Sequence, residues 1–139
     1  MAERFAILTK YIPRLIDDKY GEWVIDKEND GTKEHPIQIP FVRHSDVVRA
    51  FIQDIYKCMD ANEDMGLNHC RKILEKNGIE WSRDSMKDAD IASLDAQCIM
   101  ALIIGAHRAD RFCEGALYDF FKSGCIEKWL NRLKAIDEE

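Results

Sequence analysis

The sequence lacks a segment long enough to cross a membrane. Its longest uncharged apolar run, Cys98 to Ala106, has nine residues, whereas a spanning helix needs about 20. The first residues also carry charges at Glu3, Lys10 and Arg14, which interrupt the apolar stretch that a signal peptide requires. We therefore expect a cytoplasmic protein without a membrane span.

Paired cysteines and recognised catalytic motifs are also missing. The five cysteines form no Cys-x-x-Cys pair, so we expect reduced thiols and neither a disulfide framework nor a zinc site. The sequence contains no nucleophile elbow, no phosphate-binding glycine loop and no His-Glu-x-x-His. Cys113 and Cys125 are possible nucleophiles, but neither has a recognisable partner, and free cysteines are usually small buried hydrophobes. No cofactor is indicated, and whether the protein is an enzyme is left open.

Positive charge is in deficit. Twenty Lys and Arg residues oppose 26 Asp and Glu residues, a net charge of −6, which disfavours non-specific binding to nucleic acid. The distribution is uneven, because residues 122–134 carry four bases and one acid, whereas residues 17–34 carry seven acids and three bases. Such an asymmetry can orient a charged partner or a second copy, or it can be a solvated face with cations at a helix C-terminus.

What remains is typical of one compact domain. The chain has 139 residues, 46% of them hydrophobic and 33% charged, which is enough apolar material for one core. We predict a single helical domain over residues 1–139 with an inserted β-hairpin, in the mainly helical α+β class.

Periodicity predicts about six helices. The most apolar, over about 93–105 with Ser93 as its cap, should be the buried central helix. Pro13 should kink the first helix or make it restart at Ile12. The other expected helices are an N-terminal one over 2–17, one capped by Ser45 or Asp46, one from Asp64 closed by Asn77-Gly78, one over 112–122 ended by Ser123-Gly124, and a short last one over 126–133. Residues 79–92 are expected to form a loop that could include one helical turn.

A change to alternating polarity predicts two strands between about 22 and 42. The first contains Trp23, the second runs from Ile37 to Val42, and Asn29 to Thr32 supply the turn. Because an isolated two-stranded ribbon is marginally stable, this hairpin must lean on the helices or pair with another chain.

The densest polar cluster, Arg108 to Glu114, follows the central helix directly. If the helix continues, His107, Asp110, Arg111 and Glu114 share one face. Guanidinium groups beside carboxylates could bind a small anion, or the same charges could pair with each other and lock a helix junction. His107, Asp110 and Glu114 have the side chains of metal ligands, but Arg111 competes electrostatically and no second histidine is near. We therefore predict no metal site.

Two tryptophans, Trp23 and Trp81, lie in the non-helical parts next to acidic residues. A large amphipathic ring at such a place covers a core edge or lines a groove. Both are candidate ligand-binding residues that could roof the charge cluster.

Several short motifs together resemble a known family. The run RADRFCEGAL (108–117) is followed by Phe120-Phe121, Ser123-Gly124 and Trp129-Leu130, while residues 31–36, 40–45 and 77–81 carry further similar motifs. This pattern resembles a family of uncharacterised bacterial proteins, a domain of unknown function, over most of the chain. The resemblance implies a single-domain bacterial protein and carries over no activity.

The sequence thus leaves three hypotheses. The first is a small protein-interaction module that uses its hairpin or its basic C-terminal helix to bind a second copy of itself or another protein. The second is a small-anion or enzymatic site built on Arg108, Asp110, Arg111 and Glu114. The third, nucleic-acid binding through the basic C-terminal helix, ranks last because of the net charge.

Overall fold

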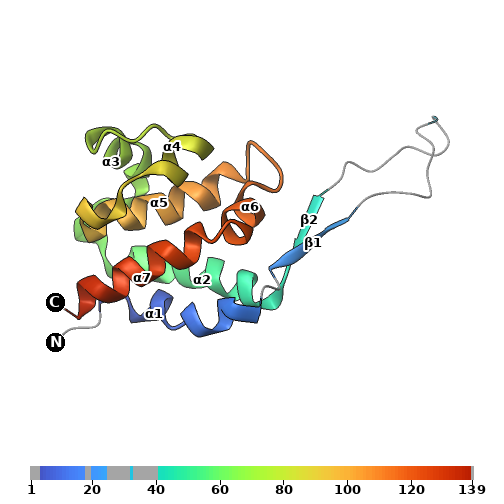
Figure 1. Ribbon diagram of the computed structural model, residues 1–139, viewed down its shortest axis with the longest axis horizontal. Coiled ribbons are helices and arrows are strands. Elements are labelled where there is room, and N and C mark those ends of the chain that lie inside the picture. Colours follow the sequence, from blue (N-terminus) through green and yellow to red (C-terminus); the bar gives the residue numbers. More distant parts are fainter. Residues whose placement is uncertain (1–3, 18–19, 25–31, 33–40, 139) are drawn as a thin grey trace.

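The computed structural model describes residues 4–17, 20–24, 32 and 41–138. Within them the chain forms a helical body and a two-stranded antiparallel ribbon that points away from one end of that body (Figure 1). The predicted mainly helical α+β class with one hairpin is confirmed.

The elements follow one another with short connections. The strands are β1 (Gly21–Val24) and β2 (Phe41–His44), and 3₁₀ turns occupy Ile12–Asp17, Glu63–Met65, Leu67–His69 and Ile91–Ser93. The helices are α1 (Ala6–Thr9), α2 (Asp46–Ala61), α3 (Cys70–Lys76), α4 (Arg83–Asp88), α5 (Ala96–Ala109), α6 (Ala116–Lys122) and α7 (Cys125–Asp137).

Helix α5 is the centre of the core, as predicted. Every residue from Cys98 to Ala106 is buried, and the helix packs against α3, α6 and α7 (Figure 1). It begins two residues later than expected because the cap is Asp95 and not Ser93, and the carboxylate of Asp95 accepts the N–H of Cys98 at 2.9 Å. A side-chain oxygen at this position satisfies one of the free N–H groups of the first turn.

The N-terminal segment packs under α2 and α7. It breaks after α1 and restarts as a 3₁₀ turn at Ile12, one of the two outcomes predicted from Pro13. Tyr11 is buried and donates its hydroxyl to the buried carboxylate of Asp54 on α2 at 2.5 Å. Burial and this bond raise the pKa of Tyr11 to about 12, so the contact is a hydrogen bond from a neutral phenol.

Several helix boundaries differ from the prediction. The segment from Asp64 forms two 3₁₀ turns before the seven-residue α3, and residues 83–88, expected to be mostly loop, form α4 with Ser82 as its cap. The predicted cap Ser45 of α2 and the left-handed Gly78 after α3 are confirmed. The last helix is longer than predicted and ends at Asp137.

The ribbon is in register with Trp23 opposite Val42 and Glu22 opposite Arg43. Strand β2 extends to His44, two residues beyond the predicted strand. The predicted turn, apart from Thr32, and the strand residues from Ile37 to Pro40 lie outside the described residues.

Candidate functional site

The segment Asp110–Gly115 connects α5 to α6, and we call it the α5–α6 loop. Helix α5 ends at Ala109, so the single helical face predicted for His107, Asp110, Arg111 and Glu114 does not form. Because the loop turns back on itself, some of its side chains contact the ribbon and others line a groove on the helical body.

Asp110 binds both the start of α6 and the ribbon. Its carboxylate accepts the N–H groups of Gly115 at 3.1 Å and Leu117 at 3.3 Å, and it lies 3.5 Å from Nε2 of His44 on β2. Burial tends to raise the pKa of Asp110, but His44 and the two N–H donors outweigh burial and hold the pKa below its ordinary value. The carboxylate therefore binds backbone N–H groups at the start of α6 and is one anchor of the ribbon.

Two more contacts fasten the ribbon to the loop. Oε1 of Glu114 accepts the N–H of Val42 at 2.8 Å. The indole ring of Trp23 lies against Gly115, at the place that a β-carbon would occupy. Of the two supports expected for the hairpin, the structure thus shows packing on the helical body.

The two arginines of the cluster have separate surroundings. Arg108 donates to the backbone carbonyl of Asn68 at 2.8 Å and contacts the thiol of Cys70, which ties the end of α5 to α3. Arg111 is exposed and forms no ion pair with any residue that the structure describes. Neither guanidinium lines the same cavity as Asp110 or Glu114, so an anion site built on all four side chains stays a prediction.

His107 faces α2. Its Nε2 lies 3.0 Å from the hydroxyl of Tyr56, and its Nδ1 is buried without a partner. Burial and the positive charge of Arg111 lower the pKa of His107, opposed by Asp110, so the imidazole is neutral at neutral pH. No group of three or more His, Cys, Asp or Glu side chains is placed to hold a metal ion within the described parts of the chain.

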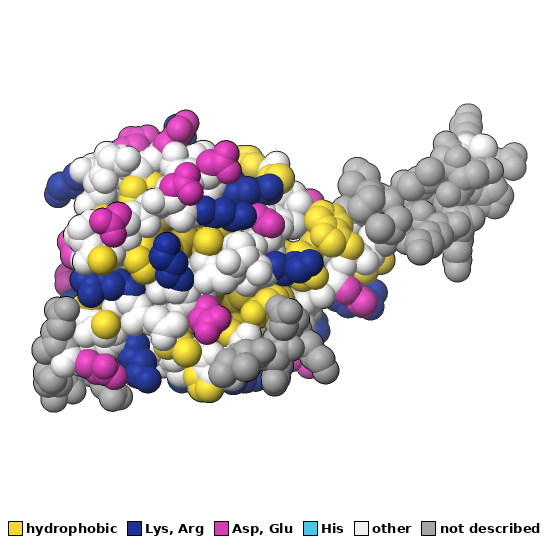
Figure 2. Space-filling model, viewed as in Figure 1, with side chains coloured by type: hydrophobic (Ala, Val, Ile, Leu, Met, Phe, Trp, Pro, Cys, Tyr) yellow, Lys and Arg dark blue, Asp and Glu magenta, His cyan; other side chains and the backbone are white. Residues whose placement is uncertain are grey.

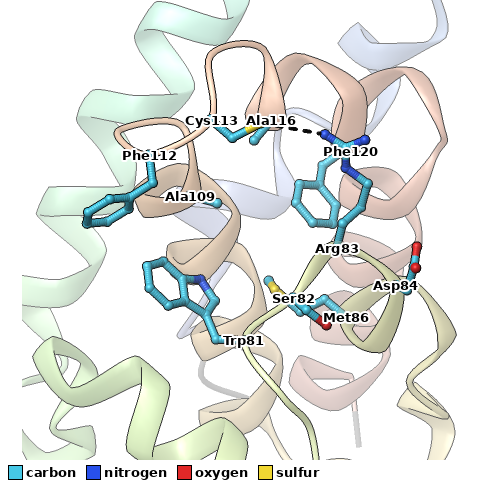
Figure 3. A pocket seen from close by; sticks show the side chains of 10 residues that line it. All are labelled: Trp81, Ser82, Arg83, Asp84, Met86, Ala109, Phe112, Cys113, Ala116 and Phe120. Carbon is cyan, nitrogen blue, oxygen red and sulfur yellow. Dashed lines mark hydrogen bonds between the residues drawn. The ribbon is translucent and has the colours of Figure 1, made fainter.

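The other side of the α5–α6 loop forms the wall of an open cavity of about 460 Å³, which we call the aromatic groove. This size lies within the ~300–1,000 Å³ typical of ligand sites, and such sites are mostly apolar with a few polar groups. The groove is lined by Trp81, Ser82, Arg83, Asp84, Met86, Ala109, Phe112, Cys113, Ala116 and Phe120 (Figure 3).

The apolar end of the groove consists of Trp81 and Phe112, whose rings meet edge to face with centroids 5.6 Å apart. Trp81 is fixed because its Nε1–H donates to the carbonyl of Gly105 at 3.0 Å. Phe112 is 79% exposed. We predicted Phe112 as part of an amphipathic helix, and this is wrong, because α6 begins four residues later.

The opposite end of the groove is polar. The guanidinium of Arg83 lies 3.9 Å from the thiol of Cys113 (Figure 3). Its Nε lies 3.4 Å from the carboxylate of Asp119. Asp119 also binds Nζ of Lys87 at 2.7 Å. Cys113 is the only exposed cysteine of the five, since Cys58, Cys70, Cys98 and Cys125 are buried.

Of the predicted site residues, only Trp81 lines this groove. Trp23 packs on the far side of the same loop, 44% exposed. Sequence reasoning missed Arg83, because a single charged residue in an aperiodic segment has no distinguishing pattern. It missed Phe112 because spacing does not distinguish an exposed ring from a core ring.

The rest of the surface shows no large area of one charge on the face drawn in Figure 2, where acidic and basic side chains alternate over the helical body. On α7 Lys128 and Lys134 are exposed, whereas Arg132 is half-buried and donates to the carbonyl of Leu94 at 3.4 Å. Among the described residues, no helix combines the length and the apolar character needed to span a membrane.

A mainly helical α+β structure with an open aromatic groove defines a structural class and no activity. Residues 72–139 match a family of unknown function, DUF6508. The matched segment contains the whole aromatic groove and the α5–α6 loop, and it excludes both strands. The similar motifs at residues 31–36 and 40–45 lie outside it. No curated protein and no solved structure matches the chain.

Proposed function

We propose that this chain is a protein-interaction module that binds a short segment of a partner protein in the aromatic groove. The observation that carries the proposal is Phe112, an aromatic ring 79% exposed beside the half-buried Trp81 over an open cavity. Aromatic side chains are enriched at the centres of protein interfaces, where a few of them supply most of the binding free energy.

The shape of the groove favours a polypeptide over an enclosed small molecule. Trp81 and the buried Phe120 and Met86 form a fixed apolar floor, and Phe112 stands above it exposed to solvent. An apolar side chain packed against the exposed ring of Phe112 would remove that ring from water, which is worth about 25 cal/mol per Å² of apolar surface. The partner residue must therefore be apolar, and its neighbours must lie along the open surface.

Two further expectations accompany this proposal. The absence of paired cysteines supports a reducing compartment, the cytoplasm, and the family resemblance supports a bacterial origin.

The ribbon's contacts with the α5–α6 loop support a role for the ribbon in holding the loop. The main competing interpretation is that the groove binds a second copy of this chain.

The test is selection of a random peptide library on the full chain, followed by titration of the enriched peptides. We expect peptides with a shared apolar residue that shift the NMR resonance of the Trp81 indole N–H and protect Cys113 from alkylation by iodoacetamide. Phe112→Ala should weaken binding about tenfold or more, as loss of an aromatic hot spot does.

The matched control is Tyr56→Ala, which removes another exposed aromatic side chain, outside the groove. This variant should bind the selected peptides like the wild type. Peptides that bind Phe112→Ala equally well, or that leave Trp81 and Cys113 unaffected, would overturn the proposal. A dimer that dissociates on Phe112→Ala in sedimentation experiments would overturn the assignment to a separate partner.

A further inference from the structure

We infer that the segment bound in the aromatic groove carries a carboxylate next to its apolar residue, and that Arg83 recognises it. The inference rests on the proposed function, since it specifies the partner of the same groove. It depends on the charges at the polar end of the groove.

At the polar end of the groove, a single carboxylate forms ion pairs with two cationic side chains. Asp119 binds Lys87 at 2.7 Å and lies 3.4 Å from Nε of Arg83. Asp84 is the one acidic residue among those that line the groove, and its carboxylate points away from the cavity (Figure 3). The cluster of Arg83, Lys87 and Asp119 therefore has one positive charge in excess, although the protein as a whole has a net charge of −6.

Arg83 also has unused donors. Its Nε faces Asp119, and one terminal nitrogen has only the weak sulfur acceptor of Cys113 at 3.9 Å. A guanidinium has five N–H donors in a fixed plane, and the two terminal nitrogens can bind both oxygens of a carboxylate. Because the side chain of Arg83 is 49% exposed, a ligand can reach these nitrogens from the open side of the groove.

The excess charge selects the kind of anion. One uncompensated positive charge matches a singly charged carboxylate, whereas a doubly charged phosphate would approach Asp119 with an extra negative charge. Trp81 and Phe112 lie across the cavity from Arg83 (Figure 3). The ligand is therefore a peptide segment with an apolar side chain for the rings and an Asp or Glu side chain for Arg83.

The test uses three capped probes, acetyl-Phe-Gly-Glu-amide, acetyl-Phe-Gly-Gln-amide and acetyl-Phe-Gly-phosphoserine-amide, titrated against the full chain with the Trp81 indole N–H resonance as readout. We expect the Glu probe to bind about three- to tenfold more tightly than the Gln probe, the range for a half-exposed charge pair. Arg83→Gln should remove this difference between the Glu and Gln probes. The control variant Arg49→Gln changes an exposed arginine on α2 and should keep the difference in affinity between the Glu and Gln probes.

The outcomes separate the two proposals. If the Glu and Gln probes bind equally and both need Phe112, the inference about Arg83 is overturned and the interaction module stands. If the phosphoserine probe binds most tightly, the carboxylate assignment is overturned. If no probe binds, or binding does not need Phe112, both proposals fail. An unchanged Trp81 resonance in unliganded Arg83→Gln confirms that the variant keeps the groove.

Discussion

The indole ring of Trp23 occupies the space beside Gly115 that any other residue would fill with its side chain. Gly115 also has a φ of +88°, a backbone conformation that residues with a β-carbon rarely adopt. The contact joins the ribbon to the loop that forms one wall of the aromatic groove, so it links two parts of the molecule that are far apart in sequence.

We expect Gly115→Ala to destabilise the protein by about 2–4 kcal/mol, because the new methyl group collides with Trp23 in addition to the strained φ. Urea unfolding measures the loss. Gly124→Ala is the matched control, since Gly124 has a φ of +84° and no neighbour within 4 Å of the added carbon, and it should lose only about 1 kcal/mol. Equal losses for the two variants would contradict the contact between Trp23 and Gly115.

Replacing Glu114 should loosen the ribbon and the groove wall together. Glu114→Gln removes the charge from the acceptor of the Val42 N–H, and hydrogen bonds to charged groups are about twice as strong as neutral ones. We expect faster amide exchange at Val42 and a changed alkylation rate at Cys113, on the same loop. The control Glu63→Gln changes an exposed acid near α2 and should alter neither rate. Faster exchange at Val42 with unchanged reactivity of Cys113 would show that the ribbon does not position the groove wall.

Replacing Arg108 by glutamine should destabilise the protein much more than replacing Arg111 by glutamine. Arg108 donates to the Asn68 carbonyl at 2.8 Å, so Arg108→Gln should cost about 1–3 kcal/mol of stability. Arg111 is exposed, so Arg111→Gln should change stability by less than about 0.5 kcal/mol. Thermal unfolding distinguishes the two. A large loss of stability for Arg111→Gln, or none for Arg108→Gln, would contradict the surroundings assigned to these two side chains.

His107 should make the protein less stable in weak acid. Its pKa is lowered in the folded state because of burial and Arg111, so below about pH 6.5 the unfolded chain takes up a proton that the folded chain does not. The contribution of neutral His107 is therefore present at higher pH and is lost as pH falls. We expect His107→Gln to flatten the decline in urea stability between about pH 7 and pH 5. The control His69→Gln replaces an exposed histidine and should leave the dependence of urea stability on pH as in the wild type. If the stability of His107→Gln and of the wild type falls in parallel as pH decreases, neutral His107 does not cause the decline.

The core could be predicted from the sequence because the apolar residues that form its central helix are consecutive in the chain. The unbroken apolar run from Cys98 to Ala106 cannot be solvated on any face, so it had to lie at the centre. Helix boundaries were less predictable, because Ser93 and Asp95 are both good caps and the choice depends on which side chain reaches a free N–H.

The groove could not be predicted in the same way. Phe112 and Phe120 are both aromatic and eight residues apart, yet one is exposed and the other buried. The difference in exposure between the two rings depends on where α5 ends and on how the α5–α6 loop turns. Asp110 fixes that turn through contacts with Gly115, Leu117 and His44. The anchoring of the ribbon depends on a strand roughly 70 residues before the loop.

By itself the sequence determined the class of fold, the buried central helix and the caps of several helices, because apolar periodicity and capping act between residues within a few turns of each other. Only the tertiary structure decided that the charged segment after α5 holds the ribbon on one side and an aromatic groove on the other. That arrangement comes from contacts between distant segments, and side-chain direction in a loop is set by whatever packs against it.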